Sequence, residues 1–349
     1  LTGESKGLLI EEARTNLIKY SGDLNAATAN TGHGWIFGST LSSFFSYIPA
    51  QKIAPDGTQT GVEFVSTAST SEGLFLRSSG ISFGAATYTA SMWVYVPTQT
   101  GVNNWGMAVD FGDTETTTVD NVTLFDQWHR ISVTVTTSAT RNFVDFNIRR
   151  NNISPANSDF FKFYVWGAQV EAGSFPTSYI PTSGSTVTRA AEYASITGSE
   201  FTSLFNNGEG TVLYSGYGTP ATTGNRRMFT INDNATGTSF DPALYADRDG
   251  TNIRLISYNG SDVNVLTVSE NPNSLQGLNL SIGYKQDDLA LSVNGSAVAT
   301  DNSATIVRNV VAFHFGSTIS TNGWCSPIKK LAIYPKRLPN ATLQAMTEA

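Results

Sequence analysis

Paired carboxyl groups are the first chemistry to look for, and residues 110–115 (DFGDTE) hold the acidic cluster nearest to a catalytic pattern. Cleavage of a glycosidic bond needs two carboxyl groups that flank the bond. Asp110 and Asp113 are three residues apart, and side chains at an odd spacing on a strand point to opposite faces of the sheet. The cluster therefore favours a solvated loop or a calcium-binding turn, and we predict no catalytic residue.

Residues that hold transition metals are few and dispersed. The sequence has one cysteine, Cys325, and three histidines, His33, His129 and His314. Zinc sites need three or four such ligands held close together, so we predict none. The single cysteine excludes an internal disulfide. Neither a nucleophile elbow nor a phosphate-binding loop occurs in the sequence.

Calcium is the one metal for which the sequence offers ligands. Asp233 lies in the turn-like stretch NDNATG, and Asp247 and Asp249 lie in DRDG. Loop carboxylates and backbone carbonyls together hold Ca²⁺ in many proteins. The spacing of an EF-hand is absent, and Asp-Gly is also a common turn former. We therefore predict no cofactor apart from a possible structural Ca²⁺ at these aspartates.

Aromatic rings in loops are the residues best suited to hold a sugar, because they stack on the apolar face of a pyranose. Trp35, Trp105 and Trp324 each lie among glycine and asparagine, as loop residues do. Asn103 and Asn104 precede Trp105 and could bond sugar hydroxyls. Loop residues carry function more often than strand residues. The alternative for each tryptophan is that it closes the end of a hydrophobic core, and for the asparagines that they form an ordinary turn.

The other three tryptophans lie in or beside segments that alternate apolar and polar residues. Trp93 is in residues 86–97 (ATYTASMWVYVP), Trp128 precedes HRISVTVT, and Trp166 is in FFKFYVWGAQV. A large aromatic side chain in a strand contributes most when it is buried. We predict that these three pack in the core.

The elements that position these residues are short strands. Charged residues make up 14% of the 349-residue chain, and serine, threonine, asparagine and glycine are abundant. Such a composition favours strands and turns over long helices. Asn259-Gly260 and Asn294-Gly295 each separate two alternating segments, which predicts hairpins. We expect an all-β protein of two antiparallel β-sandwiches with jelly-roll topology, with short helices only after Thr197 and from Asn340.

A stretch without charge divides the two groups of strands. No charged residue lies between Glu171 and Arg189, and prolines, serines and threonines fill the interval. Phe175, Tyr179 and Ile180 are large apolar residues that would hold this stretch on a surface, so we predict an ordered extended connector rather than a flexible linker. The predicted divisions are a first sandwich over 1–170, the connector over 171–196 and a second sandwich over 197–349.

The charge balance excludes some partners. The formal net charge is −7, and no cluster of lysine and arginine occurs. We therefore expect neither nucleic acid nor an anionic membrane surface as a partner. Insertion into a membrane is not expected either, because no run of about 18 apolar residues is present.

Three separated segments resemble a family of tail-fibre and other virion-surface proteins of bacteriophages and prophages. They are GLLIEEARTNLIKYS (7–21), GAQVEAGSFPTSYIPTSGSTVTRAAEYASITGSEF (167–201) and LAIYPKRLPNATLQAMTEA (331–349). The resemblance implies concanavalin A-like, laminin-G-like sandwiches, an extracellular place on the virion, assembly as a homotrimer and contact with other virion proteins. It does not cover the loops where a ligand would bind.

The resemblance leads to a specific functional expectation. We expect a tail-fibre or receptor-binding component whose loops adhere to a bacterial surface polysaccharide, with several copies raising a weak affinity for each site. Two alternatives remain open, a purely structural spike or decoration protein and a polysaccharide depolymerase or lyase. The Glu-x-Asp-x-(x)-Glu pattern of concanavalin A-like hydrolases does not occur in the sequence.

Overall fold

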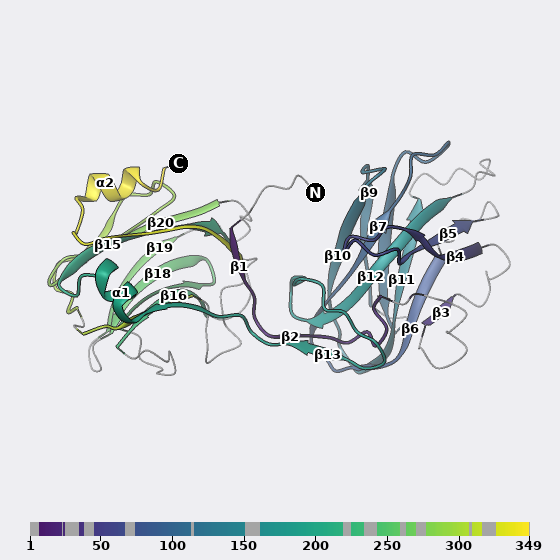
Figure 1. Ribbon diagram of the computed structural model, residues 1–349, viewed down its shortest axis with the longest axis horizontal. Coiled ribbons are helices and arrows are strands. Elements are labelled where there is room, and N and C mark those ends of the chain that lie inside the picture. The colour runs from purple at the N-terminus through teal and green to yellow at the C-terminus, as the bar shows by residue number, and fades with distance from the viewer. Residues whose placement is uncertain are drawn as a thin grey trace. The chain divides into compact units, whose positions relative to one another are not determined.

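The protein consists of two compact β-sheet units. The first unit comprises Arg14–Arg189, and the second comprises Leu1–Ala13 together with Ala190–Ala349. Nearly all regular structure is antiparallel strand, which confirms the predicted all-β class (Figure 1). The computed structural model describes residues 7–22, 24, 35–37, 45–66, 74–112, 115–150, 161–218, 225–233, 243–258, 263–269, 277–306, 309–315 and 326–348.

The first unit contains two five-stranded sheets and a short two-stranded ladder. Its strands are β2 (Arg14–Asn16), β3 (Trp35–Phe37), β4 (Phe45–Lys52), β5 (Gly61–Ser66), β6 (Leu74–Phe83), β7 (Thr87–Tyr95), β8 (Trp105–Phe111), β9 (Glu115–Val122), β10 (Trp128–Thr136), β11 (Arg141–Arg150), β12 (Lys162–Ala172) and β13 (Val187–Arg189). One sheet has the order β10-β7-β12-β5-β4 and the other β3-β6-β11-β8-β9. Strands β2 and β13 pair with each other, and Arg14 lies opposite Arg189.

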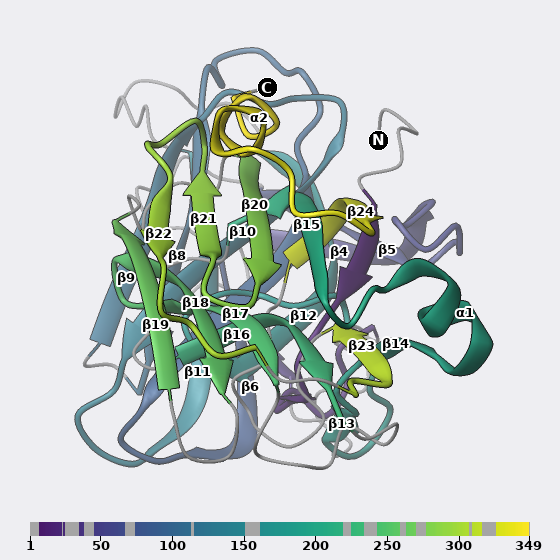
Figure 2. The same ribbon diagram turned by 90° about the vertical axis from the view of Figure 1, so that its left-hand side faces the viewer.

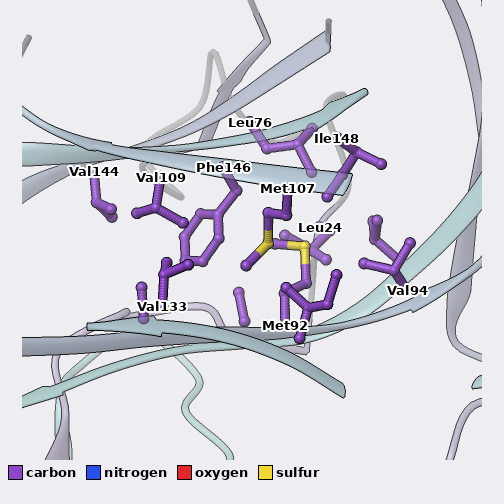
Figure 3. Packing of buried hydrophobic residues seen from close by; sticks show 14 of the residues in the cluster. Leu24, Leu76, Met92, Val94, Met107, Val109, Val133, Val144, Phe146 and Ile148 are labelled. Atoms are coloured by element: carbon purple, nitrogen blue, oxygen red, sulfur yellow. The ribbon is translucent and has the colours of Figure 1, made fainter. Parts of the chain in front are cut away.

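Alternation of side chains builds the core of the first unit. Met92 and Val94 on β7 point inward, and they meet Met107 and Val109 on β8 and Phe146 on β11 (Figure 3). Successive strand residues point to opposite faces, so this inward set fixes which residues of each strand lie on the outside.

The second unit contains two six-stranded sheets and both helices of the described chain (Figure 2). Its elements are β1 (Leu8–Ile10), β14 (Ala194–Thr197), α1 (Gly198–Leu204), β15 (Glu209–Tyr217), β16 (Asn225–Asn232), β17 (Leu244–Asp249), β18 (Asn252–Tyr258), β19 (Val263–Ser269), β20 (Gly277–Lys285), β21 (Leu289–Val293), β22 (Ala299–Asp301), β23 (Ala312–Phe315), β24 (Ser326–Tyr334) and α2 (Asn340–Ala345). The sheet orders are β1-β24-β15-β20-β21-β22 and β14-β23-β16-β17-β18-β19. Both helices lie where the sequence predicted them.

The first residues of the chain belong to the second unit, which differs from the predicted division at residue 170. Strand β1 pairs with β24, and Leu8 lies opposite Ile328. Ile10 packs in the core of the second unit, and the carboxylate of Glu12 forms an ion pair with Arg226 on β16. The chain therefore passes between the units twice, at residues 13–14 and at residues 189–190.

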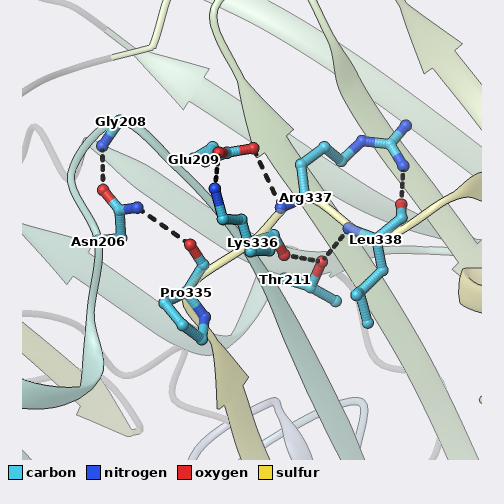
Figure 4. Close-up of polar contacts among 8 residues, drawn as sticks. All are labelled: Asn206, Gly208, Glu209, Thr211, Pro335, Lys336, Arg337 and Leu338. Atoms are coloured by element: carbon cyan, nitrogen blue, oxygen red, sulfur yellow. Dashed lines mark hydrogen bonds and ion pairs between the residues drawn. The ribbon is translucent and has the colours of Figure 1, made fainter.

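The segment before α2 is fixed by polar contacts to the start of β15 (Figure 4). The hydroxyl of Thr211 donates to the carbonyl oxygen of Lys336 (2.9 Å) and accepts from the amide of Leu338 (3.0 Å). Lys336 forms an ion pair with Glu209 (3.2 Å). This anchoring holds α2 on the outer face of β20 and β21, where Leu343 is fully buried.

Among the residues that the structure describes, neither helix has the length and apolar character needed to cross a membrane.

Candidate functional site

Two of the predicted sugar-binding tryptophans are core residues, so that prediction is wrong for them. Trp35 lies on β3 and is 1% exposed, and Trp105 lies on β8 and is fully buried. Their indole N–H groups donate to the backbone oxygens of Tyr20 (2.8 Å) and Leu124 (2.9 Å). A ring with no exposed face cannot stack on a sugar. Trp324 lies outside the described residues.

The predicted asparagines keep their loop position but lack the aromatic partner. Asn103 is exposed, and the side-chain amide of Asn104 donates to Asn121 Oδ1 (3.3 Å). Because Trp105 points into the core, neither asparagine lies beside an exposed ring of that residue. The structure therefore does not assemble the predicted site around Trp105.

Two of the three predicted calcium ligands bind a guanidinium group instead. Arg254 donates to both carboxylate oxygens of Asp247 (2.9 and 2.7 Å) and to Asp249 (2.8 Å). Asp233 is exposed at the end of β16, the strand next to β17. Within the described parts of the chain, no group of three acidic, histidine or cysteine side chains could hold a metal ion.

Asp110, the first acidic residue of the DFGDTE cluster, also has partners. Asp110 on β8 accepts from the side-chain amide of Asn147 (2.7 Å), and it lies opposite Asp145 on β11. Asp145 is held by two hydrogen bonds from Arg77 (2.8 and 2.7 Å). Both carboxylates are thus engaged by neighbouring strands of their own sheet. Asp113 lies outside the described residues.

An aromatic surface appears instead on the outside of the sheet β10-β7-β12-β5-β4. Since Met92 and Val94 point inward, Trp93 and Tyr95 point outward, and both are half-buried. Trp128 is likewise half-buried on the outer face. The prediction that Trp93 and Trp128 pack in the core is therefore wrong.

One row of this surface crosses the whole sheet. In order, the directly opposed residues are Trp128, Tyr95, Tyr164, Glu63 and Ile48, one from each strand. The rings of Trp128 and Tyr95 are 5.8 Å apart, and those of Tyr95 and Tyr164 are 5.7 Å apart, both edge to face. Such pairs hold each other in place, so the row is a fixed set of rings rather than three mobile side chains.

The neighbouring row of outward-facing positions contains two cations, Arg130 and Lys52, and a glycine, Gly61. Arg130 lies opposite Trp93, Trp93 opposite Trp166, and Lys52 opposite Gly61. A Cβ atom on Gly61 would lie 3.1 Å from the ring of Trp128, which shows how closely that ring lies over the sheet. The indole N–H of Trp128 donates to the backbone oxygen of Ile53 (2.8 Å), which fixes the ring. We call the rings of Trp93, Tyr95, Trp128 and Tyr164, with Lys52, Glu63 and Lys162, the aromatic face.

The predicted connector packs on Trp166, which lies opposite Trp93 of the aromatic face. The buried carboxylate of Glu171 accepts from the amide (2.6 Å) and the hydroxyl (2.7 Å) of Thr177, and Gln169 accepts from the amide of Ile180 (2.8 Å). The ring of Tyr179 packs on Trp166, with centroids 4.5 Å apart. Trp166 is thereby buried, as predicted, but under the connector rather than between the sheets. These hydrogen bonds and the ring contact hold this part of the connector on the sheet.

Charges on the aromatic face are close to the rings. The ammonium group of Lys52 lies 3.6 Å from the centroid of the Tyr95 ring and 5.2 Å from that of Tyr164. Lys162 forms an ion pair with Glu63 (2.8 Å). The hydrogen bond to Glu63 raises the pKa of Lys162, and burial followed by the bond to Glu63 raises the pKa of Tyr164. Both raised pKa values keep Lys162 and the phenol of Tyr164 protonated at neutral pH.

A signal for this face was present in the sequence. In ATYTASMWVYVP, the residues Ala90, Met92, Val94 and Val96 form a continuous apolar set at a spacing of two. Trp93 and Tyr95 occupy the alternate positions of the same strand. Because side chains alternate between the two faces of a sheet, this pattern alone predicts that both point outward.

Comparisons with known proteins give only remote similarities. No family model matches the chain, and no curated protein matches it. Among solved structures, it is similar to the CBM40 of Ruminococcus gnavus IT-sialidase bound to α2,3-sialyllactose, at 14% identity and a TM-score of 0.34 over 41% of this chain and 84% of that chain. It is also similar to the binding domain of botulinum neurotoxin DC in complex with SialylT (8% identity, TM-score 0.35, 44% and 38% of the chains) and to a doubly substituted human galectin-16 (11%, 0.30, 41% and 94%). Likeness at this level does not extend to a ligand or an activity.

Proposed function

We propose that the first unit binds a carbohydrate at the aromatic face. The observation that carries this proposal is the row of Trp128, Tyr95 and Tyr164, which are in register, fixed and half-exposed on the outside of a sheet. A folded protein gains more from such rings when they are buried, so aromatic groups left at a surface favour a binding role.

The groups beside the rings suit the rest of a sugar. Hydroxyl groups both donate and accept hydrogen bonds, and a site for them needs groups of both kinds. Glu63 offers acceptors, Lys162 offers donors, and Tyr164 keeps its hydroxyl proton.

We also propose a setting for this binding, the surface of a bacteriophage virion, where the protein would adhere to a bacterial surface polysaccharide. The support is the resemblance of residues 7–21, 167–201 and 331–349 to tail-fibre proteins. Light scattering after size exclusion tests the homotrimer that the resemblance implies, which would have about three times the 37.4 kDa mass of one chain.

Binding is tested with the full chain on a glycan array and on intact bacterial cells. Trp128→Ala removes the ring at the end of the row, and we expect a loss of affinity of about tenfold, from an aromatic contact of roughly 1.5 kcal/mol. Phe143→Ala is the matched control, because Phe143 is a half-buried ring on the other sheet of the same unit and also contacts a cation, Arg77, at 3.7 Å.

Two results would overturn the proposal. One is that the wild-type protein is retained by no glycan and by no cells, which would favour the purely structural role. The other is that Phe143→Ala lowers affinity as much as Trp128→Ala, since the aromatic face would then have no special part in binding.

A further inference from the structure

Lys52 is the most unusual charge on the aromatic face. Its strand, β4, is at the edge of the sheet, yet the side chain reaches inward until the ammonium group lies over Tyr95, on the third strand from β4 in the sheet order. The group is also near Tyr164. The residue is half-buried rather than extended into solvent.

No carboxylate among the described residues pairs with this ammonium group. Glu63, on the adjacent strand, forms its ion pair with Lys162. Asp126 also interacts with the charge of Lys52, but its carboxylate accepts from the amide of Thr98 (3.0 Å) and from the hydroxyl of Thr98. The pKa of Asp126 is lowered mainly by the two hydrogen bonds from Thr98, and the charge of Lys52 makes the smallest contribution.

The charge of the face contrasts with that of the chain. The aromatic face carries Lys52 and Lys162 against Glu63, whereas the chain as a whole has a formal net charge of −7. A cation that lies over aromatic rings loses part of its hydration, so a second charge that approaches it is screened less than at an open surface. The position therefore suits an anionic group on a ligand that also has a face to stack on the rings.

We propose that the aromatic face selects glycans that carry an anionic substituent, and that Lys52 is the residue that binds the anion. This inference rests on the proposed function and names its ligand class. Carboxylate, sulfate and phosphate substituents share the chemistry that an ammonium group recognises, because lysine acts as a point charge rather than as a fork matched to one anion.

The alternative role of Lys52 is to stabilise the face by its contact with Tyr95 alone. Lys52→Met keeps most of the length and of the apolar contact of the side chain but removes the charge. Lys52→Arg keeps the charge. Lys329→Met is the matched control, because the ammonium group of Lys329 lies 4.2 Å from the ring of Tyr217 in the second unit.

The experiment uses the full chain and an array that holds neutral, uronate-containing, sulfated and phosphorylated glycans. Each anionic glycan that binds is then compared with its own neutral form, obtained by carboxyl reduction, desulfation or phosphatase treatment. The treatment that removes binding identifies the anion. Titrations at two salt concentrations measure how far charge contributes.

We expect the wild-type protein to bind the anionic form at least tenfold more tightly than its neutral form. Lys52→Met should lose this preference and its dependence on salt, while Lys52→Arg and Lys329→Met should keep both. Equal binding of the two forms by the wild-type protein, or a preference that persists in Lys52→Met, overturns the inference and leaves carbohydrate binding intact. Absence of binding to every glycan overturns the proposed function, and the inference fails with it.

Discussion

Replacement of Trp105 and of Trp128 by alanine, one at a time, should separate the two roles that tryptophan has in the first unit. Trp105 is fully buried, so its removal leaves a cavity and should cost about 3–5 kcal/mol in free energy of unfolding. Trp128 is half-exposed, and its removal loses one hydrogen bond to Ile53 and one ring contact with Tyr95. These together are worth roughly 2 kcal/mol.

Urea unfolding followed by tryptophan fluorescence measures this difference in the full chain. Five of the six tryptophans lie in the first unit, so the signal reports mainly on that unit. With an m-value of about 2 kcal/mol/M, the midpoint should fall by roughly 2 M for Trp105→Ala and roughly 1 M for Trp128→Ala.

Glycan affinity should fall more for Trp128→Ala than for Trp105→Ala, which is the reverse of the order expected for stability. Below its unfolding transition, Trp105→Ala should keep the affinity of the wild-type protein, and Trp128→Ala should lose it. The reasoning is refuted if Trp128→Ala shifts the midpoint as far as Trp105→Ala, because the ring of Trp128 would then be part of the core. It is also refuted if Trp105→Ala is the variant that loses binding while still folded.

Two further predictions concern the second unit. Glu12→Ala removes the buried ion pair with Arg226 and should cost about 3 kcal/mol in the calorimetric transition of the second unit. A shift confined to the first unit would contradict the assignment of residues 1–13 to the second unit. Burial raises the pKa of Tyr284 far above that of an exposed tyrosine, with a smaller contribution from Glu209. The folded state therefore holds this proton more tightly than the unfolded state, and stability that is complete below about pH 10 should decline above it. Tyr284→Phe should remove part of that decline in unfolding curves measured from pH 8 to 11, and an unchanged slope would count against the assignment.

Fold class was predictable because it depends on local patterns. The alternation in ATYTASMWVYVP and the low charge content require strands whatever the partner strand is, and Asn294-Gly295 forms a turn after β21 as expected. The division into units was not predictable in the same way. The pairing of Leu8 with Ile328 joins segments 320 residues apart, and no local pattern specifies a partner at that distance.

Local composition predicts the wrong site because it carries no information on which face of a strand a side chain occupies. Glycine and asparagine around Trp105 suggested a loop, whereas Trp105 is the first residue of β8 and its side chain points inward. The approach of Lys52 to Tyr95 depends on the order of the strands in the sheet, which the sequence of β4 does not contain. The pairing of Asp247 with Arg254 depends likewise on the register of β17 with β18.

The pairing of β2 with β13 has a consequence for how such a protein is made and diversified. During synthesis, residues 14–189 emerge as a complete unit before β24, the partner of β1, has been translated. The direct opposition of Arg14 and Arg189 brings the two ends of that unit together, so closing the surrounding sandwich costs little more chain entropy than closing a tight turn. A unit whose two ends meet can be lengthened, shortened or replaced without disturbing the sandwich that encloses it in the sequence.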